Sequence, residues 1–363
     1  MRVVVIGAGV VGAAVAAGLG RRGAQVTVLE AGRPGEGTSG TTFAWVNAAN
    51  KEPEAYFALN LAGLRAHYAL ADERAPWFFP TGNLEWATTD EHLARLVDRM
   101  ERLRPRDYAA AWLTSAQARQ LEPDLARTSG DFAFFPEEAH VLPVALLARL
   151  LGEARDLGAT VHTGALVTEV DGGTVRTADG NRYEADVVVS CVGRWTSAVA
   201  ALAGADVPML DPDLAGSGTV GFLSTTAPLP VRLSRVLHTS RLGIRPDGGG
   251  RLLLQAVDLD RAADPAVPVA VDGEVAAEVA RRLPGVLDGT DGVVVESVRV
   301  GQRAKPSDGH PVAGFTNSRF YVVATHSGIT LAPVLADLVA GEVFGTESAL
   351  LAPFRPQRFT VKT

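Results

Sequence analysis

The stretch VVVIGAGVVGAAVAAGLGRRGAQVTVLE, residues 3–30, decides the fold of this chain. Its first four residues are a β-branched run typical of a buried parallel strand. The alanine-rich segment that ends near Gly20 predicts a helix, and residues 25–29 predict a second strand. Because a strand, a helix and a second strand form a βαβ unit, we expect a Rossmann-like α/β domain.

Three glycines at the turn between the first strand and the helix match the GxGxxG pattern. Gly7 permits the tight turn, Gly9 lets the backbone approach a pyrophosphate, and Gly12 lets the helix pack close to the strand. The helix start offers free N–H groups and a positive dipole end to phosphates. Glu30 ends the second strand, where an acid binds ribose hydroxyls and disfavours a 2′-phosphate. The stretch therefore predicts a dinucleotide site that does not take NADP.

The segment after Glu30 favours FAD over NAD. Residues 31–42 read AGRPGEGTSGTT, a long loop of small residues with several hydroxyls. A simple NAD-binding domain continues here with its next βα unit, whereas a loop of this kind can wrap an extended FAD. A flexible surface loop is the alternative interpretation.

Composition limits the other classes of protein. The length of 363 residues suggests two domains, and a net charge of −7 argues against a nucleic-acid surface. The single cysteine, Cys191, excludes an intramolecular disulfide and a CxxC metal site, and it suits a reducing compartment. Residues 3–20 have the length of a signal peptide, but their five glycines and the strand that follows favour the βαβ unit. We expect a cytoplasmic protein with no membrane span.

A metal site is not expected either. A metal site needs several ligands at short, defined spacings. The sequence instead has histidines that lie far apart, at His67, His92, His140, His162 and His238.

The remaining pattern predicts two interleaved domains. Helices over 51–71, 91–104 and 114–121 and a strand over 82–88 break the βα rhythm, and residues 214–300 become β-rich. A helix over 143–157, the strands that follow it, a strand over 319–324 and a helix over 329–341 resume it. We expect a cofactor domain from residues 1–80, 140–205 and 301–363, and a substrate domain from 81–139 and 206–300.

Five features in this order resemble the FAD-dependent D-amino acid oxidase family, which includes glycine oxidase, sarcosine oxidase and D-amino acid dehydrogenase. They are the glycine motif with Glu30 and the segments 38–42, 188–193, 301–314 and 325–333. The resemblance implies a glutathione-reductase-like FAD-binding domain built from three chain segments, with a β-rich α+β substrate domain inserted twice. Ala304 departs from the Arg-Pro pair that the family often has at 303–304.

The resemblance also implies a reaction. A neutral amine or amino acid passes its α-hydrogen to flavin N5 as a hydride, and the imine is hydrolysed by water. Oxygen or another acceptor then takes the electrons. Two alternatives stay open: oxidation of a 2-hydroxy acid on the same scaffold, and a flavin-binding subunit of a larger complex.

The resemblance assigns cofactor contacts residue by residue. They are Gly7, Gly9, Val10, Val11, Gly12, Glu30, Ala31, Arg33, Ser39, Thr41, Thr42, Val167, Cys191, Gly193, Gly328, Ile329, Thr330 and Leu331. Residues 9–11 would meet the pyrophosphate, Val167 the adenine, and the last four the flavin's pyrimidine carbonyl. Cys191 follows a buried strand and residues 38–42 contain no histidine, so we expect FAD to be held without a covalent bond.

Two residues are predicted to be catalytic. Arg303 matches the arginine that binds the substrate carboxylate, and a guanidinium suits that task; a structural ion pair is its alternative. His326 lies at the turn beside the expected flavin, and a helix-start residue bonded to the backbone is the alternative. Further candidates for the pocket are Lys305, Arg245, Trp45 and Asn47.

Overall fold

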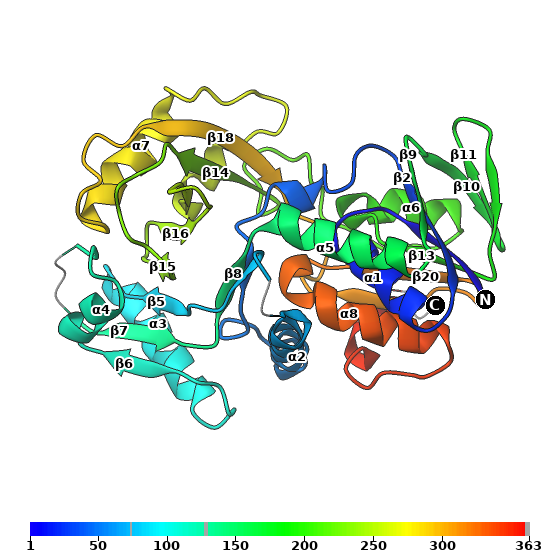
Figure 1. The fold of residues 1–363 in the computed structure, drawn as a ribbon, viewed down its shortest axis with the longest axis horizontal. Coiled ribbons are helices and arrows are strands. Elements are labelled where there is room, and N and C mark those ends of the chain that lie inside the picture. The colour runs from blue at the N-terminus through cyan, green and yellow to red at the C-terminus, as the bar shows by residue number, and fades with distance from the viewer. Residues whose placement is uncertain (73–74, 127–129, 360–363) are drawn as a thin grey trace.

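The computed structural model of the chain describes residues 1–72, 75–126 and 130–359. Two lobes lie side by side, each built on its own sheet (Figure 1). None of the helices in these ranges combines the length and the apolar character that a membrane crossing requires.

The first lobe contains a six-stranded sheet in the order β19-β20-β13-β1-β2-β9. Five of its strands are parallel, and β19 runs antiparallel to β20 at one edge. The strands are β1 (Arg2–Ile6), β2 (Gln25–Glu30), β9 (Thr160–Thr163), β13 (Val187–Ser190), β19 (Val312–Phe315) and β20 (Phe320–Ala324). Three separated stretches of the chain therefore meet in one sheet.

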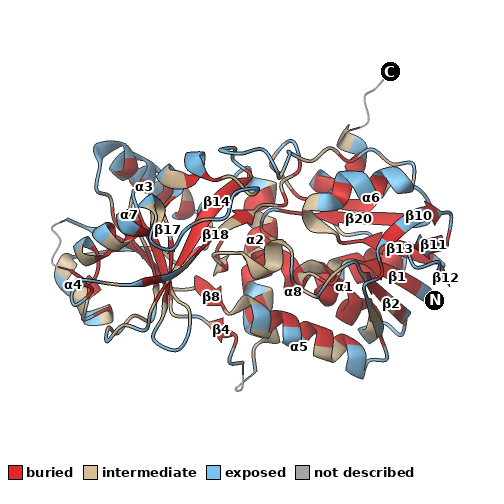
Figure 2. Ribbon diagram, turned by 90° about the horizontal axis from the view of Figure 1, so that it is seen from above, coloured by how far each residue is buried: buried red, intermediate tan, exposed pale blue. Residues whose placement is uncertain are grey.

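Both faces of this sheet are covered, which explains the unbroken apolar run of β1. Val3 and Val5 pack with the long helices on one face, whereas Val4 and Ile6 pack with a small antiparallel sheet and α6 on the other. Figure 2 shows the buried residues concentrated in these strands and in α1 and α8. The covering elements are α1 (Val10–Arg21), α2 (Glu54–Leu70), α5 (Pro143–Asp156), α6 (Thr196–Leu202), α8 (Gly328–Val343), β10 (Val167–Asp171), β11 (Thr174–Thr177) and β12 (Arg182–Glu184).

The second lobe contains an eight-stranded sheet in the order β18-β14-β17-β16-β15-β5-β7-β6. Both inserted segments contribute to it, because β5 pairs in parallel with β15. The strands are β5 (Asn83–Glu85), β6 (Ala111–Leu113), β7 (Phe132–Phe135), β14 (Val220–Thr226), β15 (Val236–His238), β16 (Gly243–Pro246), β17 (Leu252–Gln255) and β18 (Val295–Gln302). Its helices are α3 (Asp90–Leu103), α4 (Ser115–Leu121) and α7 (Glu274–Arg282).

A short three-stranded sheet lies between the lobes (Figure 1). It consists of β3 (Trp45–Val46), β8 (Ala139–Val141) and β4 (Phe78–Phe79). The 3₁₀ helices are η1 (Thr38–Gly40), η2 (Gly193–Trp195), η3 (Val257–Ala262), η4 (Leu283–Gly285), η5 (Ala352–Phe354) and η6 (Pro356–Phe359).

The predicted fold class is confirmed: a Rossmann-like domain from three segments carries a β-rich second domain inserted twice. The division at residues 80, 140, 205 and 301 stays a prediction. One element begins later than predicted. The helix expected over 51–71 starts at Glu54, because Pro53 occupies the N-cap in an extended conformation. Lys51 therefore lies in the loop before the helix.

Candidate active site

The turn after β1 has the geometry that a phosphate-binding loop needs. Gly7 has φ +98°, and a Cβ there would lie 2.7 Å from the carbonyl oxygen of Cys191. Gly9 is the extended N-cap of α1, and a Cβ on Gly12 would overlap the carbonyl oxygen of Gly7. The backbone therefore turns tightly and leaves the start of α1 uncovered by side chains at these positions. The Val10 N–H is one of the N–H groups at this helix start, and it donates to Ser39 Oγ at 3.0 Å.

Glu30 lies beside this turn and is fixed by it. Its Oε2 accepts from the Ala8 N–H at 2.8 Å, and its Oε1 accepts from the Gly32 N–H at 2.9 Å. A carboxylate has about four acceptor positions, so acceptor capacity remains for ribose hydroxyls. Arg33, by contrast, is exposed and pairs with Glu36 at 3.1 Å.

A second tight turn, which is also predicted to contact the cofactor, follows β13. Cys191 is buried there, and burial raises the pKa of its thiol far above the usual value. Gly193 has φ +59° at the start of η2, and its carbonyl accepts from Thr196 Oγ1 at 2.7 Å. The nearby Trp195 ring comes close to Gly37, which belongs to the loop of residues 31–42, called the hydroxyl loop below. A Cβ on Gly37 would lie 3.1 Å from the Trp195 ring. The loop predicted to wrap the cofactor thus meets the turn that follows β13.

The N-terminus of α8 lies against the N-terminus of α1. A Cβ on Gly328 would lie 3.4 Å from Val11 Cγ2, and Thr330 Oγ1 donates to the Trp45 carbonyl at 3.3 Å. Ile329 accepts through its carbonyl in a 2.8 Å contact with His67 Nε2. Two helix N-termini, a glycine cradle and the hydroxyl loop therefore converge, which fits an extended dinucleotide with anionic phosphates and a flavin that becomes anionic when reduced.

A cavity of about 320 Å³ lies where this region meets the eight-stranded sheet. The two predicted catalytic residues, Arg303 and His326, both line it, and so do Trp45 and Asn47. Its other lining residues are Thr38, Thr41, Thr42, Phe43, Ala44, Asn50, Lys51, Gly221, Leu223, Gln255, Val257, Gly301, Ser327, Ile329 and Thr330. Among the residues that the structure describes, no aspartate or glutamate contributes to this lining.

Arg303 is already engaged in an ion pair. Its Nη2 donates to Asp260 Oδ2 at 2.7 Å, and its Nη1 donates to the carbonyls of Gly218, at 3.3 Å, and Val220. Asp260 Oδ1 also accepts from the Phe222 N–H at 3.0 Å. Burial raises the pKa of the Asp260 carboxyl, and the Arg303 guanidinium opposes that shift. These bonds use three of the five N–H donors of the guanidinium.

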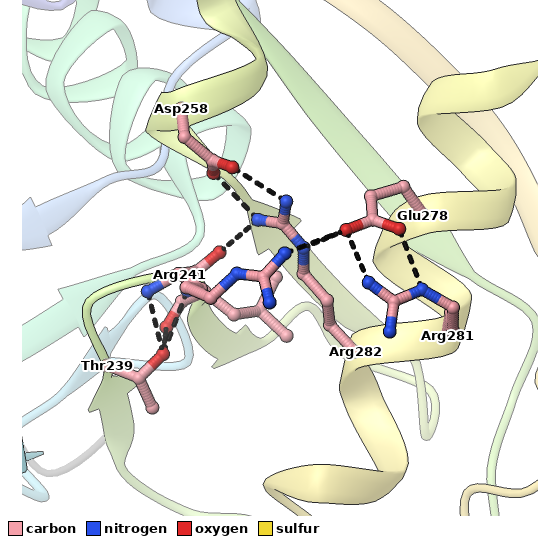
Figure 3. A network of polar contacts seen from close by, with 7 residues as sticks. Thr239, Arg241, Asp258, Glu278, Arg281 and Arg282 are labelled. Atoms are coloured by element: carbon pink, nitrogen blue, oxygen red, sulfur yellow. Dashed lines mark hydrogen bonds and ion pairs between the residues drawn. The ribbon is translucent and has the colours of Figure 1, made fainter. Parts of the chain in front are cut away.

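The segment that carries Asp260 is anchored on its other side. Asp258 accepts from Nη1 and Nη2 of Arg282 at 2.7 Å each, and Arg282 Nε donates to Glu278 at 2.7 Å (Figure 3). Ion pairs thus hold η3 to both α7 and the end of β18. This fixes Val257 at the cavity, beside Gln255.

His326 opens into the cavity as a neutral imidazole. The His326 side chain is exposed at the cavity, and its pKa is lowered by the protein around the ring and by the charges of Lys51, Arg303 and Lys305. The adjacent Ser327 shares a 2.6 Å hydrogen bond with the Tyr56 hydroxyl. His326 is therefore suited to contact a substrate without carrying charge.

Two sequence candidates lie outside the cavity lining. Arg245 is buried and bonds to Asp247 at 2.8 Å and to the Phe43 carbonyl, so it supports the loop rather than facing the cavity. Lys305 is near enough to act on His326 but does not line the cavity. No group of three or more possible metal ligands occurs within residues 1–72, 75–126 and 130–359.

Lys51 is the main residue that the sequence analysis missed. It lines the cavity, yet the sequence placed it in a helix. Pro53, two residues later, was the available signal that the helix begins after it.

Comparison with known proteins agrees with this geometry. Residues 2–342 match the DAO family, described as FAD dependent oxidoreductase, and the chain belongs to this family. The predicted family, the FAD cofactor and the oxidoreductase class are thereby confirmed.

Two of the relatives are glycine oxidases. The chain is 27% identical to glycine oxidase from Geobacillus kaustophilus over 97% of this chain and 95% of that protein. It is 25% identical to glycine oxidase from Bacillus licheniformis over 94% and 92%. The crystal structure of the Geobacillus enzyme superimposes with a TM-score of 0.85 at 25% identity, covering 98% of this chain and 99% of that one.

Proposed function

We propose that this flavoenzyme oxidises the C–N bond of a small amine that carries a carboxylate, that is, an amino acid or an N-substituted amino acid. The observation that carries the proposal is the charge of the cavity. Lys51 and Arg303 line it, whereas no carboxylate of the described residues does. A cationic lining of this kind favours an anionic ligand over a plain cationic amine. The glycine oxidase relatives support the same substrate class.

Bound FAD would supply the oxidation by accepting a hydride from the carbon that bears the amine. The amine nitrogen loses a proton to solvent, and water then hydrolyses the imine to a carbonyl compound and ammonia or a free amine. The residues of this chain position and select the substrate. We propose that His326, as a neutral imidazole, contacts the amine, and that Arg303 offers the carboxylate its two remaining N–H donors.

The cofactor contacts extend this proposal. We propose that the 18 predicted cofactor residues line the FAD site, and that the starts of α1 and α8, Glu30 and the hydroxyl loop supply its polar contacts. We also propose that the flavin carries no covalent bond, since Cys191 is buried behind the glycine turn and does not line the cavity. The lone cysteine further supports a cytoplasmic location.

Single-turnover product analysis tests the reaction. The yellow protein is mixed anaerobically with glycine, D- and L-amino acids, N-methyl amino acids and the matching 2-hydroxy acids. We expect amino compounds to bleach the flavin and to release ammonia or amine in proportion to the flavin reduced. Bleaching by a 2-hydroxy acid alone would favour the hydroxy acid alternative. A yellow protein that no compound bleaches would favour the electron-transfer subunit.

A further inference from the structure

Lys51 brings a cationic side chain to the cavity. It lies between β3 and α2, half-buried, and lines the cavity with the neighbouring Asn50. Its Nζ lies 5.8 Å from the centroid of the Tyr56 ring. Tyr56 in turn bonds to Ser327 beside His326, so the ammonium group lies near the start of α8.

No carboxylate of the described residues forms an ion pair with Lys51. Among the residues that the structure describes, Glu138 is the acid that acts on it electrostatically, and the two side chains share no hydrogen bond. The oxygens of Glu138 instead accept from the Tyr108 hydroxyl at 2.8 Å and from Trp45 Nε1 at 2.9 Å. Burial raises the pKa of Glu138 to about 8, so this carboxyl is largely protonated at neutral pH.

Arg303 differs from Lys51 in this respect. Asp260 already neutralises its guanidinium at 2.7 Å, and a substrate carboxylate placed on Arg303 would meet the negative charge of Asp260. His326 adds no charge. Among the described residues that line the cavity, one net positive charge therefore remains, and it belongs to Lys51. A substrate that reacts as a neutral amine with one carboxylate carries one negative charge, which matches this balance.

We propose that Lys51 supplies the positive charge that holds the substrate carboxylate and so determines the preference for amino acids over simple amines. This inference rests on the proposed function. An ammonium on a flexible stem has three donors and can reach a carboxylate without breaking an existing ion pair. The free N–H donors of Arg303 help to orient the carboxylate, whereas the charge of its guanidinium is balanced by Asp260 of η3.

The test uses the FAD-loaded protein and acetate, a carboxylate that carries no amine to oxidise. Acetate binding is measured by the change that it causes in the absorbance of the oxidised flavin. Lys51→Met keeps the length of the stem and removes the charge, and it is expected to weaken acetate binding roughly ten- to hundredfold, as the loss of a charge-assisted hydrogen bond does. Lys51→Arg should recover part of the affinity. Lys305→Met is the matched control, since Lys305 lies near the cavity without lining it. The acetate affinity of this variant should stay at the wild-type value.

The outcomes separate this inference from the proposed function. If wild type oxidises amino acids but Lys51→Met binds acetate normally, or if wild type binds no acetate, the inference is wrong and the function stands. If no amine bleaches the flavin but acetate binding depends on Lys51, the function fails and the anion site stands. Lys51→Gln is the second variant. Loss of FAD from both uncharged variants overturns the inference, because it would place Lys51 in cofactor binding.

Discussion

Arg303→Met tests how strongly the cavity depends on the ion pair with Asp260. The substitution keeps much of the stem but removes the guanidinium, and it leaves Asp260, whose side chain is 9% exposed, with the Phe222 N–H as its remaining bond. Removing one partner of a buried ion pair costs about 3–5 kcal/mol of stability. The Arg303 side chain is itself 22% exposed, so we expect the lower end, about 3 kcal/mol.

Urea unfolding followed by tryptophan fluorescence measures this loss. Trp86 is a suitable reporter because it lies in the core of the same lobe, with its ring 5.0 Å from that of Phe132. The double variant Arg303→Met/Asp260→Asn removes the stranded charge and should recover most of the stability. If the single variant is as stable as wild type, the pair contributes nothing. Asp260 would then not neutralise Arg303, and Lys51 would not be the residue that carries the free charge.

Three further predictions address the cofactor and the cavity. Gly12→Val should abolish FAD content, because a side chain there overlaps the Gly7 carbonyl. Gly152→Ala is the control: Gly152 is a helical glycine of the same lobe with open space around it, so this variant should retain FAD. The FAD content of both variants is measured as flavin absorbance per protein. Burial lowers the pKa of Lys51 to about 8, so the ammonium is charged below that pH and is lost as the pH rises through it. Acetate affinity should therefore fall above about pH 8 in wild type. The fall should be smaller in Lys51→Met, where Glu138, whose pKa burial raises to about 8, is left as the nearby group that titrates in this range. Acid denaturation should release all FAD from wild type and from Cys191→Ala alike, and flavin that stays with the denatured chain would contradict non-covalent binding.

Local sequence was sufficient for the cofactor half of the fold. Residues 3–30 contain a complete βαβ unit, and the glycines act within a few residues of one another, so the turn and its ligand class follow from the pattern alone. The structure places a β-branched, doubly covered strand where the pattern predicts one. The joining of β5 with β15 was not predictable in this way, since 153 residues separate Asn83 from Val236 and no local signal specifies their register.

The cavity depends on contacts that spacing does not reveal. Arg303 and Asp260 are 43 residues apart, and their pairing is set by the packing of η3 on β14, which in turn pairs with β18. Alternation along β16 does not decide which face of the sheet Arg245 takes, and the structure shows that its side chain supports the Phe43 carbonyl. Lys51 was missed because its neighbours in sequence suggested a helix, whereas its importance comes from what lies around it in space.

The most direct measurement of the central claim is the rate of anaerobic flavin reduction by an amino acid and by its decarboxylated amine. The account predicts that the amino acid reduces the wild-type flavin at least tenfold more efficiently than the amine does. This ratio corresponds to the free-energy contribution of about one charge-assisted hydrogen bond. Ammonia or amine should be released in proportion to the flavin reduced. Equal efficiency with the two compounds, or preference for the amine, would contradict the claim that this cavity selects a carboxylate.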